Sequence, residues 1–330
     1  MSIKDTLKIL ISRPKLLVSV IGVLIILLAL LLWLFCCKTD PKKDMVTAAP
    51  VHPETELPDL AEAITRFSHG SSAVPPAGME KAERDPDREA FVEDFWRWIF
   101  GEAGIPERLA RKVAASALES PAFVMELLMM LQQDPYTYFL VDKQHALPLD
   151  YEPGDLVPLT AGTYRLGRDG LKLRKIAADA LKEMAAAAAA DGIVLTVGSA
   201  YRSASYQAQV YEREVKTYGK ETADRESAQP GKSQHQLGLI VDFAPIDDSF
   251  AATPASRWLL DNAGRFGFSL SFPDGYENIT GYRWESWHYR YVGRDMAAFI
   301  KTYFDGIQQY ALKFIYAWRE QAGSPDGAPK

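Results

Sequence analysis

The chain has 330 residues, enough for one or two domains with extensions. Its 43 acidic residues outnumber the 37 basic ones, and the formal net charge is −6. Because nucleic-acid binding depends on a concentration of positive charge, this balance argues against a nucleic-acid partner.

The first predicted element is a membrane-spanning helix over residues 16–37. These 22 residues carry no charge, and at about 1.5 Å per residue they would extend about 33 Å as a helix, enough to cross the hydrocarbon core of a bilayer. Residues 1–15 contain four basic residues and one acidic residue, whereas the basic residues after the run are diluted by Asp40 and Asp44. The positive-inside rule therefore places residues 1–15 in the cytoplasm and the rest of this single-pass chain outside.

A cleaved signal sequence is the alternative to this anchor. A secretory signal peptide would have a shorter apolar region and small residues at its cleavage site, whereas this run ends in Trp33–Cys37. A lipoprotein signal would use Cys36, but Leu34 and Phe35 are bulkier than such sites usually accept. We therefore expect an uncleaved anchor. Because Cys36 and Cys37 are the only cysteines, the exported part would have no disulfide and would depend on its core and a bound metal for stability.

Two segments precede the main domain. Residues 38–86 are rich in Pro, Glu, Ala and Ser, and they predict a flexible linker. Residues 87–133 predict a helical subdomain, because apolar residues recur at three- and four-residue spacing from Phe91 to Ile99. Pro106 and Pro121 stand where a second and a third helix would begin. We expect the methionine-rich third helix to pack on the main domain rather than to face lipid or a partner.

Residues 134–321 predict the main domain, followed by a disordered polar tail at 322–330. Residues 134–160 are rich in Pro and aromatic residues and predict an extended segment that wraps the domain. Helices are expected at 168–190, 203–218, 256–264 and 295–321, and strands at 193–197, 239–244 and 287–292. Because these elements follow no regular βαβ rhythm, we predict an α+β fold.

Two short segments of the main domain carry a candidate metal site. The first contains His235 and Asp242, and the second contains His288 with Glu285 three residues before it. Catalytic zinc typically takes three protein ligands from His, Asp and Glu and leaves a fourth position for water. A nearby carboxylate that does not bind the metal can accept the proton of that water. The chain has five histidines, so few other ligand sets are available.

Each segment alone favours a structural explanation. A histidine between aromatic residues, as His288 is, packs in a core more often than it binds a metal. An aspartate after a short apolar run, as Asp242 is, often only caps a strand end. The two segments together, with Gly238 allowing a tight turn between the first two ligands and with a third motif, favour the metal site.

The third motif, Gly198–Ser203, lies between a predicted strand and a predicted helix. A strand-to-helix turn exposes its side chains, so Arg202 could reach into a cleft. Arginine there suits a substrate carboxylate or the oxyanion that forms when water attacks an amide. A surface arginine in a turn would be the simpler explanation if this motif stood alone.

In their order and spacing, the three motifs resemble the VanY-type D-alanyl-D-alanine carboxypeptidases, zinc peptidases of bacterial cell-wall metabolism. The motifs are Ser199–Ser203 with Gln207, Ser233–Gly238 with Asp242, and Glu285–Gly293. The resemblance covers about residues 134–300. It implies the hedgehog/DD-peptidase fold, an α+β arrangement of a small antiparallel sheet with flanking helices, here preceded by the helical subdomain and the transmembrane helix.

The family pattern, carried over position by position, makes His235, Asp242 and His288 the zinc ligands. It makes Glu285 the catalytic base, and Arg202 would polarise the scissile carbonyl or stabilise the tetrahedral intermediate. The remaining motif residues would bind substrate: Ser233, Gln207 and Tyr201.

The resemblance implies a zinc-dependent carboxypeptidase that removes the terminal D-Ala from peptidoglycan stem peptides, on the outer side of a bacterial cytoplasmic membrane. An L,D-carboxypeptidase acting on tetrapeptide stems and a D-Ala-D-Ala dipeptidase would use the same chemistry. A zinc-stabilised cell-wall binding module without catalysis would not need Glu285. Ile240 and Ser286 depart from the pattern, which often has Ala and Pro there, and we expect altered packing rather than lost activity.

Overall fold

The structure is a computed structural model, and it describes residues 86–321. The predicted membrane span at 16–37 and all but the last residue of the predicted linker at 38–86 lie outside this part, as does the predicted tail at 322–330. Between residues 86 and 321, no helix combines the length and the apolar character needed to cross a membrane.

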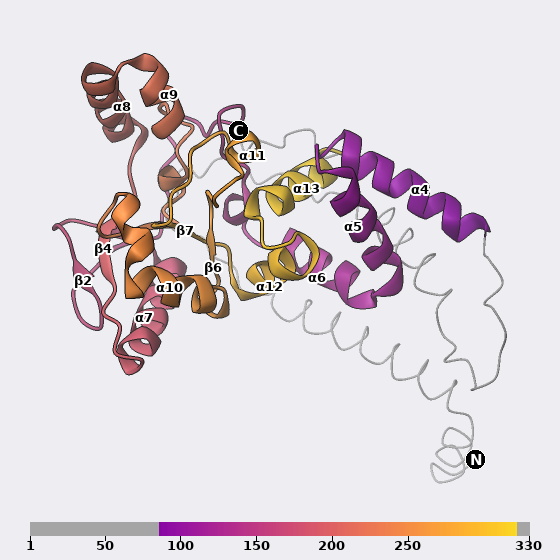
Figure 1. Cartoon of the computed structure of the whole chain (residues 1–330), viewed down its shortest axis with the longest axis horizontal. Helices are drawn as coiled ribbons and strands as arrows, with labels where there is room; N and C mark the ends of the chain where they lie inside the picture. Colours follow the sequence, from indigo (N-terminus) through magenta and orange to yellow (C-terminus); the bar gives the residue numbers. More distant parts are fainter. Residues whose placement is uncertain (1–85, 322–330) are drawn as a thin grey trace, which may run out of the picture. The chain divides into compact units, whose positions relative to one another are not determined.

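A five-stranded sheet forms the centre of the domain, in the order β2–β4–β5–β7–β6 (Figure 1). The strands are β2 (Arg165–Leu166), β4 (Thr196–Ser199), β5 (Ile240–Phe243), β6 (Phe268–Leu270) and β7 (His288–Tyr291). Strand β2 pairs with β4 in parallel, whereas the other neighbours are antiparallel. The predicted α+β class is therefore correct, but the predicted antiparallel sheet is mixed. The parallel pair forms because the chain travels through β3 and a whole helix between β2 and β4, as a crossover requires.

The start of the first long helix differs from the prediction. Helix α7 (Lys175–Ala190) begins at Lys175 rather than at 168, because Lys172–Arg174 form strand β3 against β1 (Leu156–Pro158). The strand predicted at 193–197 is shifted to Thr196–Ser199, since the Ile193 N–H still bonds the Ala188 carbonyl of the helix end. The first difference arises from the pairing of β3 with β1, whereas the second arises from the local backbone geometry at the end of α7.

Other predicted elements agree with the structure. Helix α8 (Ala204–Tyr218) begins after Ser203, whose hydroxyl accepts a hydrogen bond from the Tyr206 N–H. Strands β5 and β7 and helix α10 (Pro254–Asn262) fall within or beside their predicted ranges. The remaining short helices are η1 (Pro135–Tyr138), α9 (Lys220–Glu226), η2 (Gln234–Leu237), η3 (Asp248–Ala252), η4 (Ala263–Phe266) and α11 (Glu277–Thr280).

Helices α4 (Pro86–Gly101), α5 (Glu107–Glu119) and α6 (Pro121–Leu131) form the helical segment before the sheet, as predicted. They share one buried core with α12 (Arg294–Tyr303) and α13 (Gln308–Gln321). Helix α12 contacts both strand β6 and helices α5 and α6, so it lies between the sheet and the helical segment (Figure 1). The domain boundary at 133 stays a prediction.

The single helix predicted at 295–321 is wrong, because it is divided into α12 and α13. Asp305 and Gly306 have positive φ angles of 52° and 80°, which an α-helix cannot contain. The Asp305 carboxylate is held by Arg108 at 2.9 Å and by Lys112 at 2.6 Å. The turn is therefore tied to α5 by ion pairs that local periodicity does not reveal.

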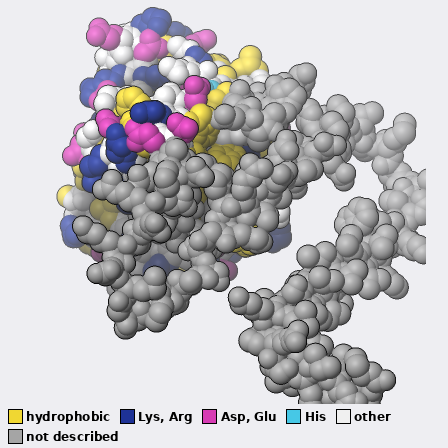
Figure 2. Space-filling model, turned by 90° about the vertical axis from the view of Figure 1, so that its right-hand side faces the viewer, with side chains coloured by type: hydrophobic (Ala, Val, Ile, Leu, Met, Phe, Trp, Pro, Cys, Tyr) yellow, Lys and Arg dark blue, Asp and Glu magenta, His cyan; other side chains and the backbone are white. Residues whose placement is uncertain are grey.

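On the face shown in Figure 2, basic and acidic side chains of the described residues are interspersed.

Replacing Phe123 tests whether α6 packs in the core that it shares with α12 and α13. Phe123 is 1% exposed, and its ring lies 4.8 Å from Tyr303 and 5.2 Å from Phe299, between ring centroids. Phe123→Ala should lower the free energy of unfolding by about 3–5 kcal/mol, measured by urea denaturation. Met125→Ala is the control on the same helix, because Met125 is 56% exposed and its loss should change stability by less than about 0.5 kcal/mol. Equal, small effects of the two changes would contradict the shared core.

Candidate active site

The sheet brings two of the three predicted ligands together. Asp242 on β5 and His288 on β7 stand directly opposite each other in the antiparallel register, which places both side chains on one face. His235 reaches this face from η2, just before β5. One donor atom from each of the three residues lies within 4.8 Å of the others. Folding thus brings these three residues, which are separated along the sequence, into one cluster.

His235 presents its Nε2 atom to the cluster. Its Nδ1 lies 2.5 Å from the Ala200 carbonyl oxygen, an acceptor, so Nδ1 carries the proton and Nε2 is left with a lone pair. Nε2 is 3.1 Å from Oδ2 of Asp242. Gly238 makes the turn into β5 with a φ of 68°, and a Cβ there would come within 2.9 Å of Leu156. The turn therefore requires glycine, as the sequence predicts.

His288 presents the other ring nitrogen. Its Nδ1 lies 3.0 Å from Oδ1 of Asp242 and 3.3 Å from Oε2 of Glu285. Its Nε2 faces Oε1 of Gln234 at 3.4 Å, on the side away from the cluster. The two imidazoles stand nearly perpendicular, with their ring centroids 5.0 Å apart. Both histidines therefore direct one nitrogen toward Asp242 and hold the other nitrogen against an acceptor.

A bound cation would satisfy the donor atoms of the cluster better than hydrogen bonds among them do. His235 is 1% exposed, and Asp242 and His288 are each 4% exposed. Nε2 of His235 and Oδ1 of Asp242 are buried without a hydrogen-bond partner in the described part of the chain. Buried polar atoms without partners are costly, and a metal ion would satisfy both. Two imidazoles and one carboxylate are the donor set of three-ligand zinc sites.

The three groups have strongly different proton affinities in the metal-free protein. Burial, together with the charge of Arg202, lowers the pKa of His235 to about 4. Burial also lowers the pKa of His288, but Asp242 and Glu285 outweigh it and raise this pKa to about 9. Burial opposes ionisation of Asp242, yet the two imidazoles hold the pKa of its carboxyl well below its usual range. At neutral pH the metal-free cluster thus contains one carboxylate and one imidazolium.

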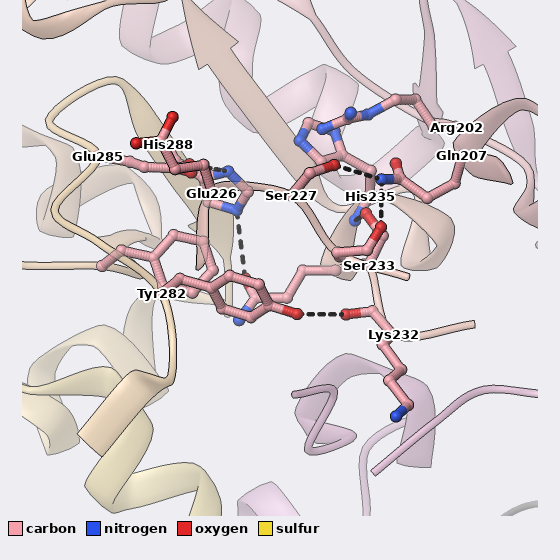
Figure 3. Close-up of a pocket in the computed structure, with 13 residues that line it drawn as sticks. Arg202, Gln207, Glu226, Ser227, Lys232, Ser233, His235, Tyr282, Glu285 and His288 are labelled. Carbon is pink, nitrogen blue, oxygen red and sulfur yellow. Dashed lines mark hydrogen bonds and ion pairs between the residues drawn. The ribbon is translucent and has the colours of Figure 1, made fainter. Parts of the chain in front are cut away.

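Glu285 lies beside the cluster without belonging to it. A tight turn, in which the His288 N–H bonds the Glu285 carbonyl at 3.2 Å, brings the two side chains together. The Glu285 side chain is 14% exposed, whereas that of His288 is 5% exposed. The carboxylate therefore faces the pocket in front of the cluster, as Figure 3 shows. A carboxylate in this position can exchange a proton with a molecule bound in the pocket.

The pocket in front of the cluster encloses about 390 Å³, including space open to solvent. It is lined by the predicted site residues Arg202, Gln207, Ser233, His235, Glu285 and His288 (Figure 3). Tyr201 is not among the lining residues, and its hydroxyl is buried without a hydrogen-bond partner in the described structure. The structure therefore brings together every predicted site residue except Tyr201, because Asp242, which does not line the pocket, belongs to the cluster with His235 and His288.

Arg202 and Gln207 line this pocket, and each has a buried polar atom without a hydrogen-bond partner in the described structure. The Nη2 atom of Arg202 is 3.8 Å from Oδ2 of Asp242, too far for a hydrogen bond, and its buried Nε has no acceptor among the described residues. The amide of Gln207 donates to the Ala228 carbonyl at 2.7 Å, which orients its Oε1 away from that contact. This Oε1 is buried and accepts no hydrogen bond from the described chain. The pocket thus contains a cation and an acceptor for a polar ligand.

Sequence reasoning missed several residues of the pocket. Phe272 and Tyr282 form an aromatic wall, with ring centroids 5.1 Å apart, and Phe272 also lies 4.7 Å from the His288 ring. The Tyr282 hydroxyl points toward the Lys232 carbonyl at 3.5 Å. Aromatic residues in a loop have no periodic pattern that distinguishes a pocket wall from a core. Gln234 stands between two predicted site residues, but its contact with His288 depends on tertiary folding.

Comparison with known proteins identifies the family of this site. The family model described as VanY, D-alanyl-D-alanine carboxypeptidase, matches residues 170–294. That range contains all three donors of the cluster, Glu285 and the pocket residues Arg202 and Gln207. The helices before residue 170 and helix α13 lie outside it.

Two curated relatives have similar sequences. YodJ of Bacillus subtilis (strain 168), which is named provisionally as a carboxypeptidase, is 38% identical over 181 residues, covering 53% of this chain and 66% of the relative. A D-alanyl-D-alanine carboxypeptidase of Enterococcus faecalis (strain ATCC 700802 / V583) is 32% identical over 184 residues, covering 53% and 65%. The chain thus matches just under two thirds of the length of these curated relatives.

A solved structure has a similar fold. The LdcB LD-carboxypeptidase, whose structure is described as revealing the molecular basis of peptidoglycan recognition, is 36% identical in sequence. The match covers 55% of this chain and 88% of that chain, with a TM-score of 0.50. The two chains are therefore similar in sequence as well as in fold.

The protonation of His288 provides a test of the cluster. With a pKa of about 9, this imidazole carries two protons at pH 7 in the metal-free protein, whereas His235, with a pKa of about 4, is neutral. Because a metal ligand must be a bare nitrogen, zinc should displace one proton from His288 at pH 7. Side-chain ¹⁵N NMR of the two histidines should show one imidazolium before zinc addition and two neutral rings after it. A neutral His288 at pH 7 before zinc addition would contradict this picture.

Proposed function

Because this chain belongs to the VanY family, we propose that it is a zinc-dependent D-alanyl-D-alanine carboxypeptidase that removes the terminal D-Ala from peptidoglycan stem peptides. The observation that carries this proposal is the position of Glu285. Its carboxylate faces the pocket 3.3 Å from a donor atom of the metal cluster. A purely structural zinc site does not need a free carboxylate at its open side, so the position favours catalysis over a binding module.

His235, Asp242 and His288 would hold the zinc ion. Bound there, zinc supplies Lewis acidity and lowers the pKa of a coordinated water toward about 7. The protein contributes a buried environment, because the three ligands are nearly inaccessible to solvent. Low polarity around the site strengthens the electrostatic interactions of charges that form during the reaction.

Glu285 moves the proton. Its carboxylate accepts a proton from the attacking water, which adds to the carbonyl carbon of the terminal peptide bond. The same carboxyl group then donates this proton to the nitrogen of the leaving D-Ala as the C–N bond breaks. The position of Glu285 in the turn before His288 supports this double role, because the carboxylate can reach both the water and the leaving nitrogen from the pocket side.

Arg202, Gln207 and Ser233 orient the substrate. The Arg202 guanidinium, which lines the pocket, stabilises either the oxyanion of the tetrahedral intermediate or the substrate carboxylate. Oε1 of Gln207 accepts from a peptide N–H of the stem, and this oxygen has no other donor in the described structure. The Ser233 hydroxyl accepts a hydrogen bond from the backbone N–H of His235 at 3.3 Å and still has its own proton to donate.

An L,D-carboxypeptidase that removes D-Ala from a tetrapeptide stem is the second candidate. It is favoured by the similarity to the LdcB LD-carboxypeptidase, which at 36% identity exceeds the 32% shared with the Enterococcus faecalis enzyme. Both reactions use the same cluster, Glu285 and Arg202. They differ in the configuration and length of the peptide on the amino side of the bond.

The proposed location is the outer face of a bacterial cytoplasmic membrane, with the enzyme anchored by residues 16–37. The support is the uncharged run of 22 residues and the excess of basic residues before it. The full-length protein should then sediment with membranes and resist extraction by alkaline carbonate. A chain without residues 1–37 should be released, and retention of that shorter chain on membranes would count against the anchor.

Defined stem peptides separate the two candidate reactions. The full-length enzyme, with its zinc content measured, is incubated with tri-, tetra- and pentapeptide stems, and the products are weighed by mass spectrometry. Loss of one alanine from the pentapeptide that ends in D-Ala-D-Ala, prevented by chelator and restored by zinc, is the expected result. Cleavage of the tetrapeptide alone would favour the L,D reaction. An intact set of peptides in the presence of bound zinc would reject both.

Glu285→Ala should abolish turnover while zinc remains bound. Without the carboxylate no group accepts the proton of the attacking water, and kcat should fall by at least about 100-fold. Glu226→Ala is the matched control, because Glu226 also lines the pocket but is not in the cluster. Its kcat should stay within a few-fold of the wild type. Substantial activity of the Glu285 variant, with one zinc per chain, would remove Glu285 from the proposed role.

A further inference from the structure

The imidazole of His288 is supported on the side opposite the metal cluster. Its Nε2 faces Oε1 of Gln234 at 3.4 Å, and the Ser271 hydroxyl donates to the same oxygen at 2.8 Å. The Ser271 backbone N–H also donates to the His288 carbonyl at 3.1 Å. Gln234 is 4% exposed and Ser271 is 2% exposed. Ser271 therefore contacts both the backbone of the ligand and the side chain that holds its ring.

Helix α13 adds the next contact in this chain of hydrogen bonds. Gln308, which is 1% exposed, donates from Nε2 to the Ser269 carbonyl of β6 at 3.1 Å. This bond orients the amide, so that its Oε1 lies 3.4 Å from the Ser271 hydroxyl as a second, longer acceptor. Gln308 lies beyond residue 294, where the family match ends. A helix outside the matched region thus contacts the support of a metal ligand.

The direction of these bonds matters for metal binding. An imidazole that binds a metal through Nδ1 must carry its proton on Nε2, and an acceptor at Nε2 fixes both this tautomer and the orientation of the ring. The Ser271 proton is directed to Oε1 of Gln234, which keeps the amide oxygen rather than its NH2 group toward His288. The orientation of Gln234 and the bare Nδ1 of His288 are consequently coupled.

We propose that Gln234 and Ser271 are positioning residues of the metal centre, and that Gln308 connects them to helix α13. This inference rests on the proposed zinc-binding function. Because α13 shares its buried core with α4–α6, the helices outside the family match contribute to zinc affinity through this connection.

The test measures the zinc dissociation constant of the full-length protein by competition with a chromophoric chelator, at fixed pH. Gln234→Met and Ser271→Ala should each weaken zinc binding by about 10- to 100-fold. Gln234→Glu keeps an acceptor of the same size at Nε2 and should bind zinc at least as tightly as the wild type. A residue that merely fills space would show no difference between the Glu and Met variants.

Helix α13 offers a matched pair of neighbouring glutamines. Gln308→Ala should weaken zinc binding by a few-fold, with kcat on stem peptides falling in proportion to zinc occupancy. Gln309→Ala is the control, because its equally buried amide donates to Asp142 at 3.0 Å rather than to the support of His288. Zinc affinity of this variant should equal that of the wild type.

The possible results separate the inference from the proposed function. Wild-type zinc affinity in the Gln234→Met, Ser271→Ala and Gln308→Ala proteins would overturn the inference while leaving the zinc enzyme intact. Equal weakening by Gln234→Glu and Gln234→Met would also overturn it. A wild-type chain that binds no zinc would overturn both. If Ser271→Ala fails to fold, as judged by thermal unfolding of the metal-free protein, the two Gln234 variants decide.

Discussion

The site depends on the burial of one carboxylate between two imidazoles. Asp242 is 4% exposed, and Arg202, the nearest guanidinium to it, stays 3.8 Å away. A buried charge is tolerated only when it is paired, and in the metal-free protein the imidazolium of His288 provides the pairing. A divalent cation can take the place of that proton and also satisfy the lone pair of His235. The same constraint keeps the cluster together without metal and prepares it for metal.

Several elements of the fold hold Asp242 between the two histidines. The register of β5 and β7 places Asp242 opposite His288, and the left-handed turn at Gly238 returns the chain from His235 into β5. The Ala200 carbonyl, just beyond β4, fixes the tautomer of His235. On the other side, hydrogen bonds through Gln234 and Ser271 reach toward helix α13. The residues of the cluster therefore stand on strands and a short turn, with hydrogen bonds to the rings of both histidines.

Local sequence patterns were sufficient for features that depend on neighbouring residues. The cap of α8 at Ser203, the strands β5 and β7, and the proline-led starts of α5 and α6 all follow from short-range preferences. The three ligands and Glu285 could be proposed because their motifs combine residue types that zinc chemistry requires. The family resemblance then supplied roles that local patterns alone left open, such as those of Ser233 and Gln207.

Features that depend on tertiary pairing could not be predicted in this way. Lys172–Arg174 look helical by periodicity but pair with β1, and the last helix is interrupted at Asp305 and Gly306, whose φ angles are positive. Tyr201 lies in a motif but not in the pocket lining, whereas Gln234 supports a ligand without any sequence signal for that role. For β3 and for Gln234, the deciding partner lies in another segment of the chain.

The proposed function requires that His235 Nε2, His288 Nδ1 and the Asp242 carboxylate hold one zinc ion in front of Glu285. The most direct test is a crystal structure of the zinc-loaded protein with anomalous diffraction data collected on both sides of the zinc absorption edge. We expect one anomalous peak, about 2.0–2.2 Å from these three donors, with the Glu285 carboxylate outside the coordination shell. A peak bound through Nε2 of His288, a peak elsewhere in the protein, or Glu285 as a zinc ligand would contradict it.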